Sequence, residues 1–376
     1  MKLPSRNLIY SAIRLRFARK YVIRPLGWTF GVVGVVFLTY FFLWDRHLNE
    51  QDLDRFLKYR PVLSTRIFDI TGNIIIELPG ISHWALRTPE YRRWVTYDEI
   101  PPLMRNALLA AEDQRFMSHN GIDYWSLLLR VPLETLTESL RKTLRTWKPQ
   151  IVKVQGASTI DQQTVQLVYF DKVSGARSLF QKFQKMRMAL QLNRDFHGWF
   201  GKRAAKKRIF EIFANASYFG ESRYGIDAAA EHFFGRKLSD FNNSDLAPEA
   251  ALLAGMIRSS VKYSPRGDVQ YEARARRNGI LKIMADVGFI DRENLAVYQR
   301  ALIKTSPADS TKTIAPAVVQ YVLKSQFGKV GEPEVSWRGG ITIRTTVNLE
   351  AQKNLNEAVA YGVALYRGRQ IGRAHV

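Results

Sequence analysis

One long apolar segment lies near the start of the chain. Residues 26–44 read LGWTFGVVGVVFLTYFFLW and contain no charged side chain, and about 19 apolar residues suffice for a helix that crosses a bilayer. The residues before it carry seven Lys and Arg and no acid, so the positive-inside rule places the N-terminus in the cytoplasm and the chain after Asp45 outside. The segment is long for a signal peptide, and no small-residue cleavage site follows it. The sequence therefore predicts a transmembrane helix rather than a cleaved leader or a buried core helix.

After this segment the pattern changes from alternation to helical periodicity. Residues 65–78 alternate apolar and polar side chains around a turn at 71–73, which is typical of a β-hairpin. From Glu99 to Met284 the apolar positions mostly recur at helical spacing, and residues 341–365 read as a strand followed by a helix. We therefore predict a mostly α protein with five parts: a basic cytoplasmic tail at 1–25, the transmembrane helix at 26–44, a β-hairpin linker at 45–95, a mostly helical domain at 96–290 and a further linker at 291–376.

Capping residues indicate where the helices begin and end. Pro101 and Pro102 suit the first turn of a helix, and Gly121 is the glycine that we expect to end it. Residues 156–170 read as a loop that runs into a helix, with Ser158 as its N-cap and Asp161 as the capping-box partner. Further helical patterns lie at 127–146, 206–216 and 245–258.

Charge and cysteine content narrow the possible functions. The formal net charge is +22 and the chain has no Cys, which indicates an anionic partner and excludes disulfides and thiolate metal sites. The sequence contains no zinc-finger, P-loop or RNA-binding motif, and most of the chain is predicted to lie outside the cell membrane, so we expect no nucleic acid as a partner. The six His residues have no metal-ligand spacing, and no metal site is predicted.

A pair of adjacent carboxylates is the first candidate for chemistry. The apolar run at 107–111 ends in Glu112 and Asp113, although acids are disfavoured at the C-terminal end of a helix. Such a position, beside a second acid and apolar residues, should raise the pKa of Glu112 as general acid or base catalysis requires. Phe116 and His119 would follow on the same helical stripe. Two solvated acids at a frayed helix end are the alternative, and residue chemistry alone leaves it open.

Hydroxyl and amide side chains form a second candidate site. Ser158, Thr159, Gln162 and Gln163 lie at the predicted start of one helix, where they could line an anion or sugar site. N-capping residues of this kind are common, so this signal is weak by itself.

A basic segment is the third candidate. Residues 172–208 hold eleven Lys and Arg and one acid, Asp195, with Phe196, Trp199 and Phe200 between them. This mixture favours contact with anionic lipid headgroups. A pocket for a pyrophosphate and a solvated basic face are the alternatives.

Several long motifs in a fixed order resemble those of the bacterial peptidoglycan glycosyltransferases. EDQRFMSHNGID at 112–123 resembles their motif E-D-x-x-F-x-x-H-x-G, and GASTIDQQ at 156–163 resembles G-x-S-T-x-x-Q-Q. RIFEIFANASYFG at 208–220 is similar to I-x-E-x-Y-x-N-x-x-Y-x-G, and the segments at 225–265 and 274–284 resemble those that close the domain. The family is glycosyltransferase family 51, found in class A penicillin-binding proteins and in monofunctional transglycosylases.

The resemblance implies a mostly α, lysozyme-like fold and a specific reaction. Glu112 would be the general base that takes the proton from the 4-hydroxyl of a lipid II sugar, whose oxygen attacks the anomeric carbon of the growing glycan with inversion, releasing undecaprenyl pyrophosphate. No cofactor is required, and Mg²⁺ is a candidate aid to the basic side chains at the leaving group. The implied substrate-binding residues are Asp113, Phe116, His119, Ser158, Thr159, Gln162, Gln163, Lys182, Glu211, Asn215 and Arg277.

The resemblance also implies partners and a location. Lipid II and the growing glycan chain would be the substrates, and other proteins of cell-wall synthesis are candidate partners. The protein would be a single-pass protein of the bacterial inner membrane, with its N-terminus in the cytoplasm and its catalytic domain in the periplasm.

Two motifs depart from the family pattern. The second motif usually continues as Q-Q-x-x-K, but Gln166 stands at the Lys position; the third is R-K-x-x-E, but Gln181 and Lys185 replace its Arg and Glu, and only Lys182 matches. The spacer between the first two motifs is also long, with an extra charged segment at 141–148. The exchange of residues could keep positive charge in the pocket, or it could mark a site that has lost activity.

Three hypotheses therefore stand: a polymerase of glycan strands, a catalytically weak or inactive relative that binds lipid II or envelope proteins, and a lysozyme-type enzyme that cleaves glycan. The linker after 291 is of the kind that precedes a penicillin-binding domain, while the K-T-G element of such a domain does not occur in the sequence. The last six residues, IGRAHV, resemble a translated sequencing adapter. We expect the natural protein to continue beyond them.

Overall fold

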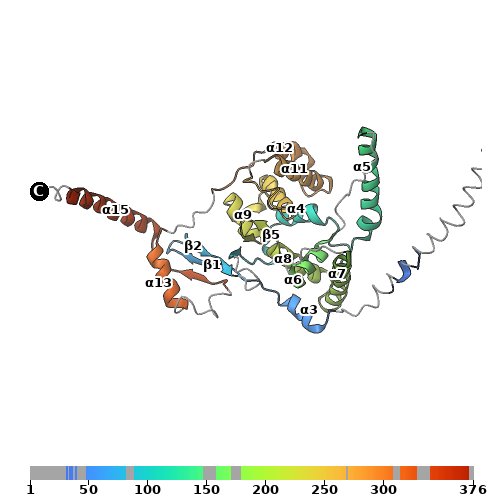
Figure 1. Cartoon of the computed structure of the whole chain (residues 1–376), viewed down its shortest axis with the longest axis horizontal. Coiled ribbons are helices and arrows are strands. Elements are labelled where there is room, and N and C mark those ends of the chain that lie inside the picture. Colours follow the sequence, from blue (N-terminus) through green and yellow to red (C-terminus); the bar gives the residue numbers. More distant parts are fainter. Residues whose placement is uncertain are drawn as a thin grey trace, which may run out of the picture.

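The computed structural model describes residues 31–32, 34–36, 39, 48–81, 89–146, 158–170, 179–267, 270–307, 314–327 and 339–371. These residues are mostly helical, as predicted, with two small sheets (Figure 1). The predicted cytoplasmic tail at 1–25 and most of the predicted transmembrane helix at 26–44 lie outside the described residues. Among the residues described, none of the helices combines the length and the apolar character that crossing a membrane requires.

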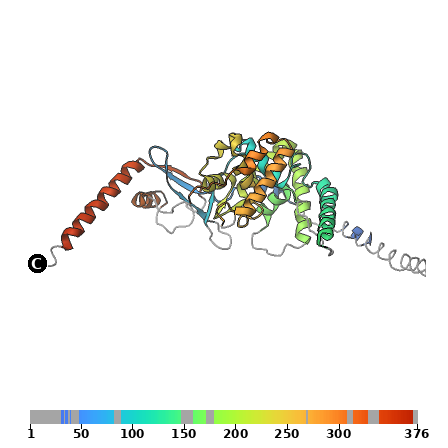
Figure 2. The same ribbon diagram turned by 90° about the horizontal axis from the view of Figure 1, so that it is seen from above.

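One helical body contains the predicted site. In its core, α10 packs against both α4 and α11, and α8 packs against both α6 and α7. The helices of this body are α3 (Glu50–Leu57), α4 (Pro102–Glu112), α6 (Ile160–Tyr169), α7 (Leu179–Phe200), α8 (Lys202–Ala216), α9 (Ile226–Phe234), α10 (Ala247–Met256), α11 (Gln270–Asp286) and α12 (Leu295–Arg300). A π-helical turn at Ser126–Arg130 leads into α5 (Val131–Thr146), which projects from the edge of this body (Figures 1 and 2). Short 3₁₀ turns lie at Tyr97–Glu99, Leu238–Asn242, Ser244–Leu246 and Arg292–Asn294.

The predicted β-hairpin is confirmed, and it belongs to a three-stranded sheet. Strands β1 (Thr65–Phe68) and β2 (Ile74–Leu78) pair antiparallel, and β7 (Thr342–Arg344) adds parallel to β1. Buried Ile67 and Ile75 pack with α13 (Pro316–Phe327) in a second, smaller core. The predicted strand and helix near the C-terminus are therefore also confirmed, as β7 and α15 (Leu349–Ile371).

A second sheet was not predicted. Its strand order is β3-β4-β6-β5, formed by β3 (Gly80–Ile81), β4 (Pro89–Arg92), β6 (Arg223–Tyr224) and β5 (Tyr218–Gly220). The parallel pairing of β4 with β6 ties the chain before α4 to the chain after α8. This sheet therefore fixes the entrance of the first helix relative to the rest of the body.

The first helix starts as predicted but ends earlier. Pro102 is the first residue of α4, whereas its last residue is Glu112, and Asp113 is the C-cap with an extended backbone (φ −161°, ψ 83°). The prediction that Gly121 ends this helix is wrong. Phe116 and His119 consequently do not continue a helical stripe but lie in the turns that follow α4.

Candidate active site

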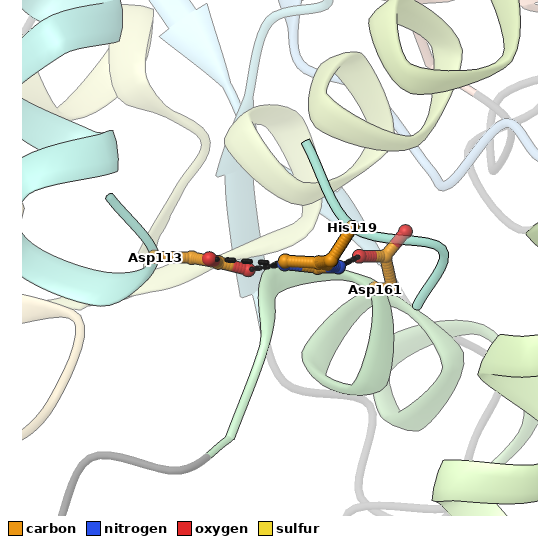
Figure 3. A group of neighbouring side chains, drawn as sticks. All are labelled: Asp113, His119 and Asp161. Atoms are coloured by element: carbon orange, nitrogen blue, oxygen red, sulfur yellow. Dashed lines mark hydrogen bonds and ion pairs between the residues drawn. The ribbon is translucent and has the colours of Figure 1, made fainter. Parts of the chain in front are cut away.

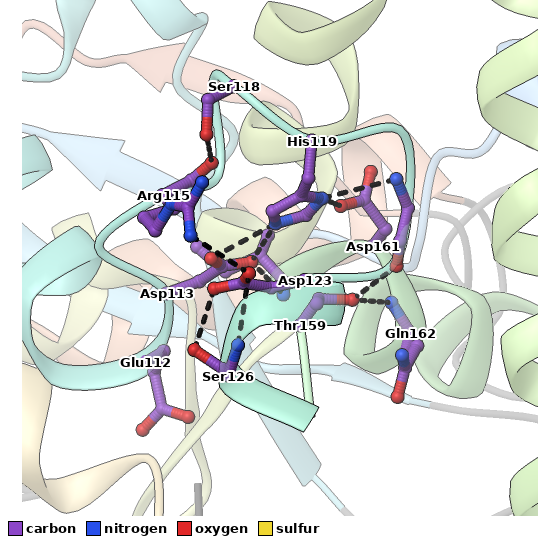
Figure 4. A network of polar contacts seen from close by, with 12 residues as sticks. Glu112, Asp113, Arg115, Ser118, His119, Asp123, Ser126, Thr159, Asp161 and Gln162 are labelled. Atoms are coloured by element: carbon purple, nitrogen blue, oxygen red, sulfur yellow. Dashed lines mark hydrogen bonds and ion pairs between the residues drawn. The ribbon is translucent and has the colours of Figure 1, made fainter. Parts of the chain in front are cut away.

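The two adjacent carboxylates at the end of α4 point to different partners. Figure 4 shows the side chain of Asp113 turned toward His119 and that of Glu112 turned away from this network. Asp113 accepts the backbone N–H of Ile160, the first residue of α6, at 3.0 Å. Its carboxylate also contacts Nε2 of His119 at 3.0 and 3.1 Å. The end of α4 is thereby joined to the start of α6, where a negative charge is favourable.

A buried ion pair completes this network. Lys206 on α8 donates to both carboxylate oxygens of Asp161 at 2.9 Å, and both side chains are 0% exposed. The Lys206 ammonium also lies 4.3 Å from the centre of the Phe116 ring, in reach of a cation–π interaction. Burial lowers the pKa of Lys206, and Asp161 opposes that shift. The second motif is thus held against α8 by a salt bridge, and the Phe116 ring of the first motif contacts the same Lys206 ammonium.

Three of these residues have the donor atoms of a metal site. Ligand atoms of Asp113, His119 and Asp161 lie within 4.8 Å of one another (Figure 3). However, Lys206 already bonds both oxygens of Asp161, and the Gly121 N–H donates to Nδ1 of His119 at 3.2 Å. Mg²⁺ requires an octahedral shell of oxygen ligands and keeps several waters. These residues do not fit Mg²⁺, so no step of the chemistry is assigned to it at this place.

The start of α6 differs in detail from the prediction. Thr159, not Ser158, is the N-cap: its hydroxyl accepts the Gln162 N–H at 3.3 Å and donates to the Gly121 carbonyl at 2.7 Å. Asp161 is not a capping-box partner, because its carboxylate is engaged by Lys206. Ser158 is exposed.

Gly121 is needed where it stands for two reasons. Its φ of +99° is a left-handed value that L side chains rarely adopt, and a Cβ at this position would lie 2.6 Å from the Ala189 carbonyl oxygen on α7. The glycine therefore lets the loop after α4 approach α7 while its own carbonyl holds Thr159.

Glu112 lies in an environment suited to a catalytic carboxylate. Its side chain is 13% exposed, its Oε2 accepts Gln163 Nε2 at 2.8 Å, and its Oε1 is 3.9 Å from Nη2 of Arg276. Burial raises the pKa of Glu112, outweighing the lowering by the Gln163 hydrogen bond and by the charges of Arg276 and Arg258. The charge of Asp113 adds a smaller upward shift. The predicted direction is confirmed, with burial as the main cause.

Two buried polar atoms near the start of α6 are unsatisfied within the described part of the chain. They are Oε1 of Glu112 and Nε2 of Gln162. Because buried polar groups are normally hydrogen-bonded, these atoms mark a place where an added ligand or water would find partners. The sugar or anion site that the residue types suggested stays a prediction.

Two further predicted residues position the chain just before α4. Glu211 accepts Nε1 of Trp94 at 3.0 Å and the Tyr97 N–H at 3.1 Å. One turn later on α8, Asn215 bonds both backbone groups of Val95, at 2.9 and 2.7 Å. The side-chain polar atoms of both residues are engaged in fixing this segment, and their contact with a substrate stays a prediction.

The arginine that approaches Glu112 is Arg276, whereas the sequence predicted Arg277 as a site residue. Arg277 is 1% exposed and donates to the carbonyls of Ala301 and Gln299 at 2.7 and 2.8 Å. It therefore holds the last turn of α12 and the residue after it to α11. Arg276, which sequence reasoning missed, faces Glu112 instead.

Close packing between α10 and α11 makes this approach possible. A Cβ on Gly255 of α10 would lie 2.8 Å from Cγ of Arg276, so only glycine leaves room for the arginine side chain. Arg258, just after α10, is a second cation whose charge acts on Glu112. Lys182, by contrast, is exposed on α7.

Comparison with known proteins gives a consistent set of relatives. A family model described as Transglycosylase matches residues 81–285, just over half of the chain. Penicillin-binding protein 1A of Aquifex aeolicus is 27% identical over 339 residues, which cover 89% of this chain and 41% of that protein. Penicillin-binding protein 1A of Streptococcus pneumoniae is 29% identical over 312 residues, which cover 79% of this chain and 38% of that protein. The chain thus spans about two fifths of the length of these relatives.

Solved structures include a similar chain as well. The crystal structure of penicillin-binding protein 1A from Haemophilus influenzae aligns with a TM-score of 0.35 at 15% sequence identity. The alignment covers 78% of this chain and 28% of that chain.

Proposed function

This chain belongs to the transglycosylase family, and from that premise we propose that it is a membrane-anchored peptidoglycan glycosyltransferase. It polymerises lipid II into glycan strands with inversion and releases undecaprenyl pyrophosphate. The observation that carries the proposal is the environment of Glu112: a nearly buried carboxylate with a raised pKa, oriented by Gln163 and approached by Arg276.

The proposed chemistry uses these groups directly. Glu112 takes the proton from the 4-hydroxyl of the incoming lipid II sugar, and that oxygen forms a bond to the anomeric carbon of the growing glycan. The bond from that carbon to the pyrophosphate oxygen breaks on the opposite face, and the leaving group departs as undecaprenyl pyrophosphate. A carboxylate with raised proton affinity is a better base than an exposed one, provided that it is ionised at the working pH.

Charge around Glu112 suits an anionic leaving group. The charges of Arg276 and Arg258 act on the Glu112 carboxylate, and α7 carries Lys182 and Lys185. Such cations stabilise charge that develops on a departing pyrophosphate. The net charge of +22 agrees with an anionic substrate and an anionic membrane surface.

Exposed aromatic side chains support contact with that surface. Trp199 and Phe200 at the end of α7 are 53% and 50% exposed, and basic Lys202 and Arg203 follow them directly. Aromatic rings beside basic residues are typical of the membrane interface. This arrangement favours the membrane contact predicted for the basic segment, with the N-terminus in the cytoplasm and this body in the periplasm.

A catalytically weak or inactive relative that binds lipid II is the second candidate. One observation favours it: Lys185 stands where the family motif has a catalytic-site Glu, and it contacts Gln166, which stands where the motif has Lys. A site with this exchange could hold the lipid diphosphate without turning it over.

Turnover of labelled lipid II by the full chain in detergent separates these functions. We expect polymer from the wild type and from the control Glu293→Gln, whose side chain is exposed in the 3₁₀ turn before α12. Glu112→Gln should lose activity by about 10²- to 10⁴-fold. Binding of lipid II without polymer would favour the inactive relative, and shortening of preformed strands would favour a lysozyme-type enzyme. Equal polymer from Glu112→Gln and the wild type would refute the proposed base.

A further inference from the structure

The chain that follows α10 carries one of the cations that act on the proposed base. Residues 257–267, called the α10 loop below, form successive turns, and Arg258 lies at the beginning of this loop. Gly255, in the last turn of α10, lies against Arg276, whose Nη2 is 3.9 Å from Oε1 of Glu112. The charge of Arg258 acts on both Arg276 and Glu112. The first part of the loop therefore borders the proposed base.

Several hydrogen bonds shape the α10 loop from within. The Tyr263 N–H donates to the Ser259 carbonyl at 3.0 Å, and the Gly267 N–H donates to the Ser264 carbonyl at 3.3 Å. The Arg266 N–H donates to the Ser264 hydroxyl at 3.2 Å. These bonds fix the local shape of the loop, but its place relative to the helices depends on contacts with other elements.

The side chain of Arg266 makes such contacts with three other segments. Its Nη1 donates to Oε2 of Glu221 in the turn between β5 and β6 at 2.7 Å. Its Nη2 donates to the carbonyl of His232 on α9 at 2.7 Å, and to those of Ser306 and Pro307 after α12 at 2.9 and 3.2 Å. One guanidinium group thus ties the end of the α10 loop to all three segments.

The turn between β5 and β6 has an unusual backbone at this contact. Glu221 and Ser222 have φ values of +48° and +60°, in the left-handed region that residues other than Gly rarely adopt. Such conformations persist where surrounding contacts hold them, and they are concentrated at functional sites. Glu221 contacts Arg266 and also Nε2 of His232, at 2.6 Å, while the Ser222 carbonyl accepts the Tyr91 N–H at 2.9 Å.

The same turn also meets the first part of the α10 loop. A Cβ on Gly220, whose φ is +100°, would lie 3.2 Å from Cβ of Ser260. Ser260 follows Arg258 by two residues. The turn therefore contacts the loop close to Arg258 and, through Glu221, at Arg266.

We infer that Arg266 and Glu221 are positioning residues, whose ion pair holds the α10 loop against the β5–β6 turn and thereby places Arg258 beside the Glu112 carboxylate. This inference rests on the proposed function, and it adds two residues that act through a third. The Arg258 side chain is exposed and lies in a loop, so its distance from Glu112 depends on how that loop is held. A cation that is held beside a carboxyl group keeps it ionised to lower pH.

Two substitutions of opposite charge separate positioning from direct electrostatics. Loss of a cation raises the pKa of a nearby carboxyl group, and loss of an anion lowers it. Direct action on Glu112 would therefore move the acid limb of the activity profile, where activity falls as pH is lowered, in opposite directions in Arg266→Met and Glu221→Gln. If both residues act by placing Arg258, both substitutions should move the limb to higher pH, as Arg258→Gln should.

The pH profile of lipid II turnover by the full chain in detergent gives this comparison. At a pH below the limb we expect turnover to fall by about 2- to 10-fold in each variant, because one pKa unit changes the ionised fraction about tenfold. The control Arg292→Met removes an exposed ion pair with Asp286 and should leave the limb in place. Shifts in opposite directions, or no shift in either variant, would overturn the inference.

A double variant tests whether the effect passes through Arg258. Arg266→Met in a chain that already carries Arg258→Gln should shift the acid limb no further, whereas independent effects would add. Additive shifts would refute the positioning role. Arg266→Met should also lower the midpoint of thermal unfolding, because it removes the donor of several carbonyl groups. Glu221 is 41% exposed, so Glu221→Gln provides the test even if Arg266→Met does not fold.

A titration without substrate separates failure of this inference from failure of the proposed function. Carbon-13 NMR of the chain labelled in its Glu side chains, with the Glu112 signal assigned by its loss in Glu112→Gln, reports the pKa of Glu112 directly. If the wild type makes no polymer but this pKa rises in both Arg266→Met and Glu221→Gln, the positioning role stands and the function is that of a binding relative. If the wild type makes polymer and the pKa rises in neither variant, the inference is wrong and the glycosyltransferase stands.

Discussion

The carboxylate of Asp113 accepts the backbone N–H of Ile160 at 3.0 Å, so the last turn of α4 and the first turn of α6 share one charge. An acid at a helix C-terminus destabilises that helix, but the same acid is favourable at the N-terminus of the next one. This contact explains why two acids follow the apolar run at 107–111. Asp113 joins the two helices, and the join places Glu112 beside Gln163.

Replacing Asp113 by Asn should weaken the join without abolishing it. The amide oxygen can still accept the Ile160 N–H, but the negative charge at the start of α6 and the charged partner of His119 are lost. We expect a loss of about 1–3 kcal/mol in the free energy of unfolding, measured by denaturant titration. The control Asp286→Asn removes an exposed ion pair with Arg292 and should cost at most about 1 kcal/mol; equal losses in both variants would contradict the assignment.

The buried pair of Asp161 and Lys206 should be the most sensitive point of the network. Lys206→Met leaves an unpaired buried carboxylate, which costs about 3–5 kcal/mol, and the eight Trp residues provide a fluorescence signal for unfolding. Adding Asp161→Asn removes that charge and should recover more than half of the loss. Additive losses in the double variant would show that the two side chains do not act as a pair.

The raised pKa of Glu112 predicts an opposite pH dependence for activity and for stability. Activity requires the ionised base. As pH is lowered, activity should therefore begin to fall at a higher pH than it would with an exposed Glu, whose pKa is about 4.3. Because the folded-state pKa lies above the unfolded one, the folded protein holds this proton more tightly, and this contribution to stability is lost as pH rises through the folded pKa.

Thermal unfolding of Glu112→Gln at several pH values checks the stability half of this prediction. Gln does not titrate, so the variant should gain stability relative to the wild type as pH rises from about 4 to 7. Glu293→Gln, exposed, should show no such trend. A constant difference for Glu112→Gln would mean that the carboxyl group titrates alike in both states.

Local signals in the sequence predict much of the fold. Alternation around residues 71–73 gives the hairpin, and the proline pair gives the start of α4 at Pro102. The end of α4 could not be predicted in this way, because the bond from Ile160 to Asp113 spans 47 residues. The sheet β3-β4-β6-β5 was missed because its strands have only two to four residues and because the central pairing of β4 with β6 joins segments far apart in the sequence.

The sequence also identified only some of the side chains in the candidate site. The motifs contain Glu112, Gln163 and Asp161, the partner of Lys206, but they do not show which basic residue faces the Glu112 carboxylate. The buried positions of α11 are Ala273, Arg277, Ile280, Leu281, Met284 and Ala285. Position 277 thus lies on the apolar stripe, which indicates a structural arginine. The direction of the Arg276 side chain depends on how α10 packs against α11 at Gly255.

These neighbouring arginines give a prediction that separates a chemical role from a structural one. Arg276→Gln removes a charge that lowers the pKa of Glu112. That pKa should therefore rise further, and the acid limb of the activity profile should move to higher pH while the unfolding midpoint changes little. Arg277→Gln leaves the pH limb in place but removes buried bonds to the carbonyls of Gln299 and Ala301, at a cost of about 3 kcal/mol or more.

Two measurements on both variants test this difference between Arg276 and Arg277: the pH profile of lipid II turnover and the midpoint of thermal unfolding. Adjacent residues on a helix point about 100° apart, so the two substitutions act on different sides of α11 although they are equal in chemistry. If both variants shifted the acid limb equally, the cation beside Glu112 would not be Arg276 alone. If neither did, the carboxylate would not be the group whose ionisation controls the rate, and the proposed base would have to be sought elsewhere.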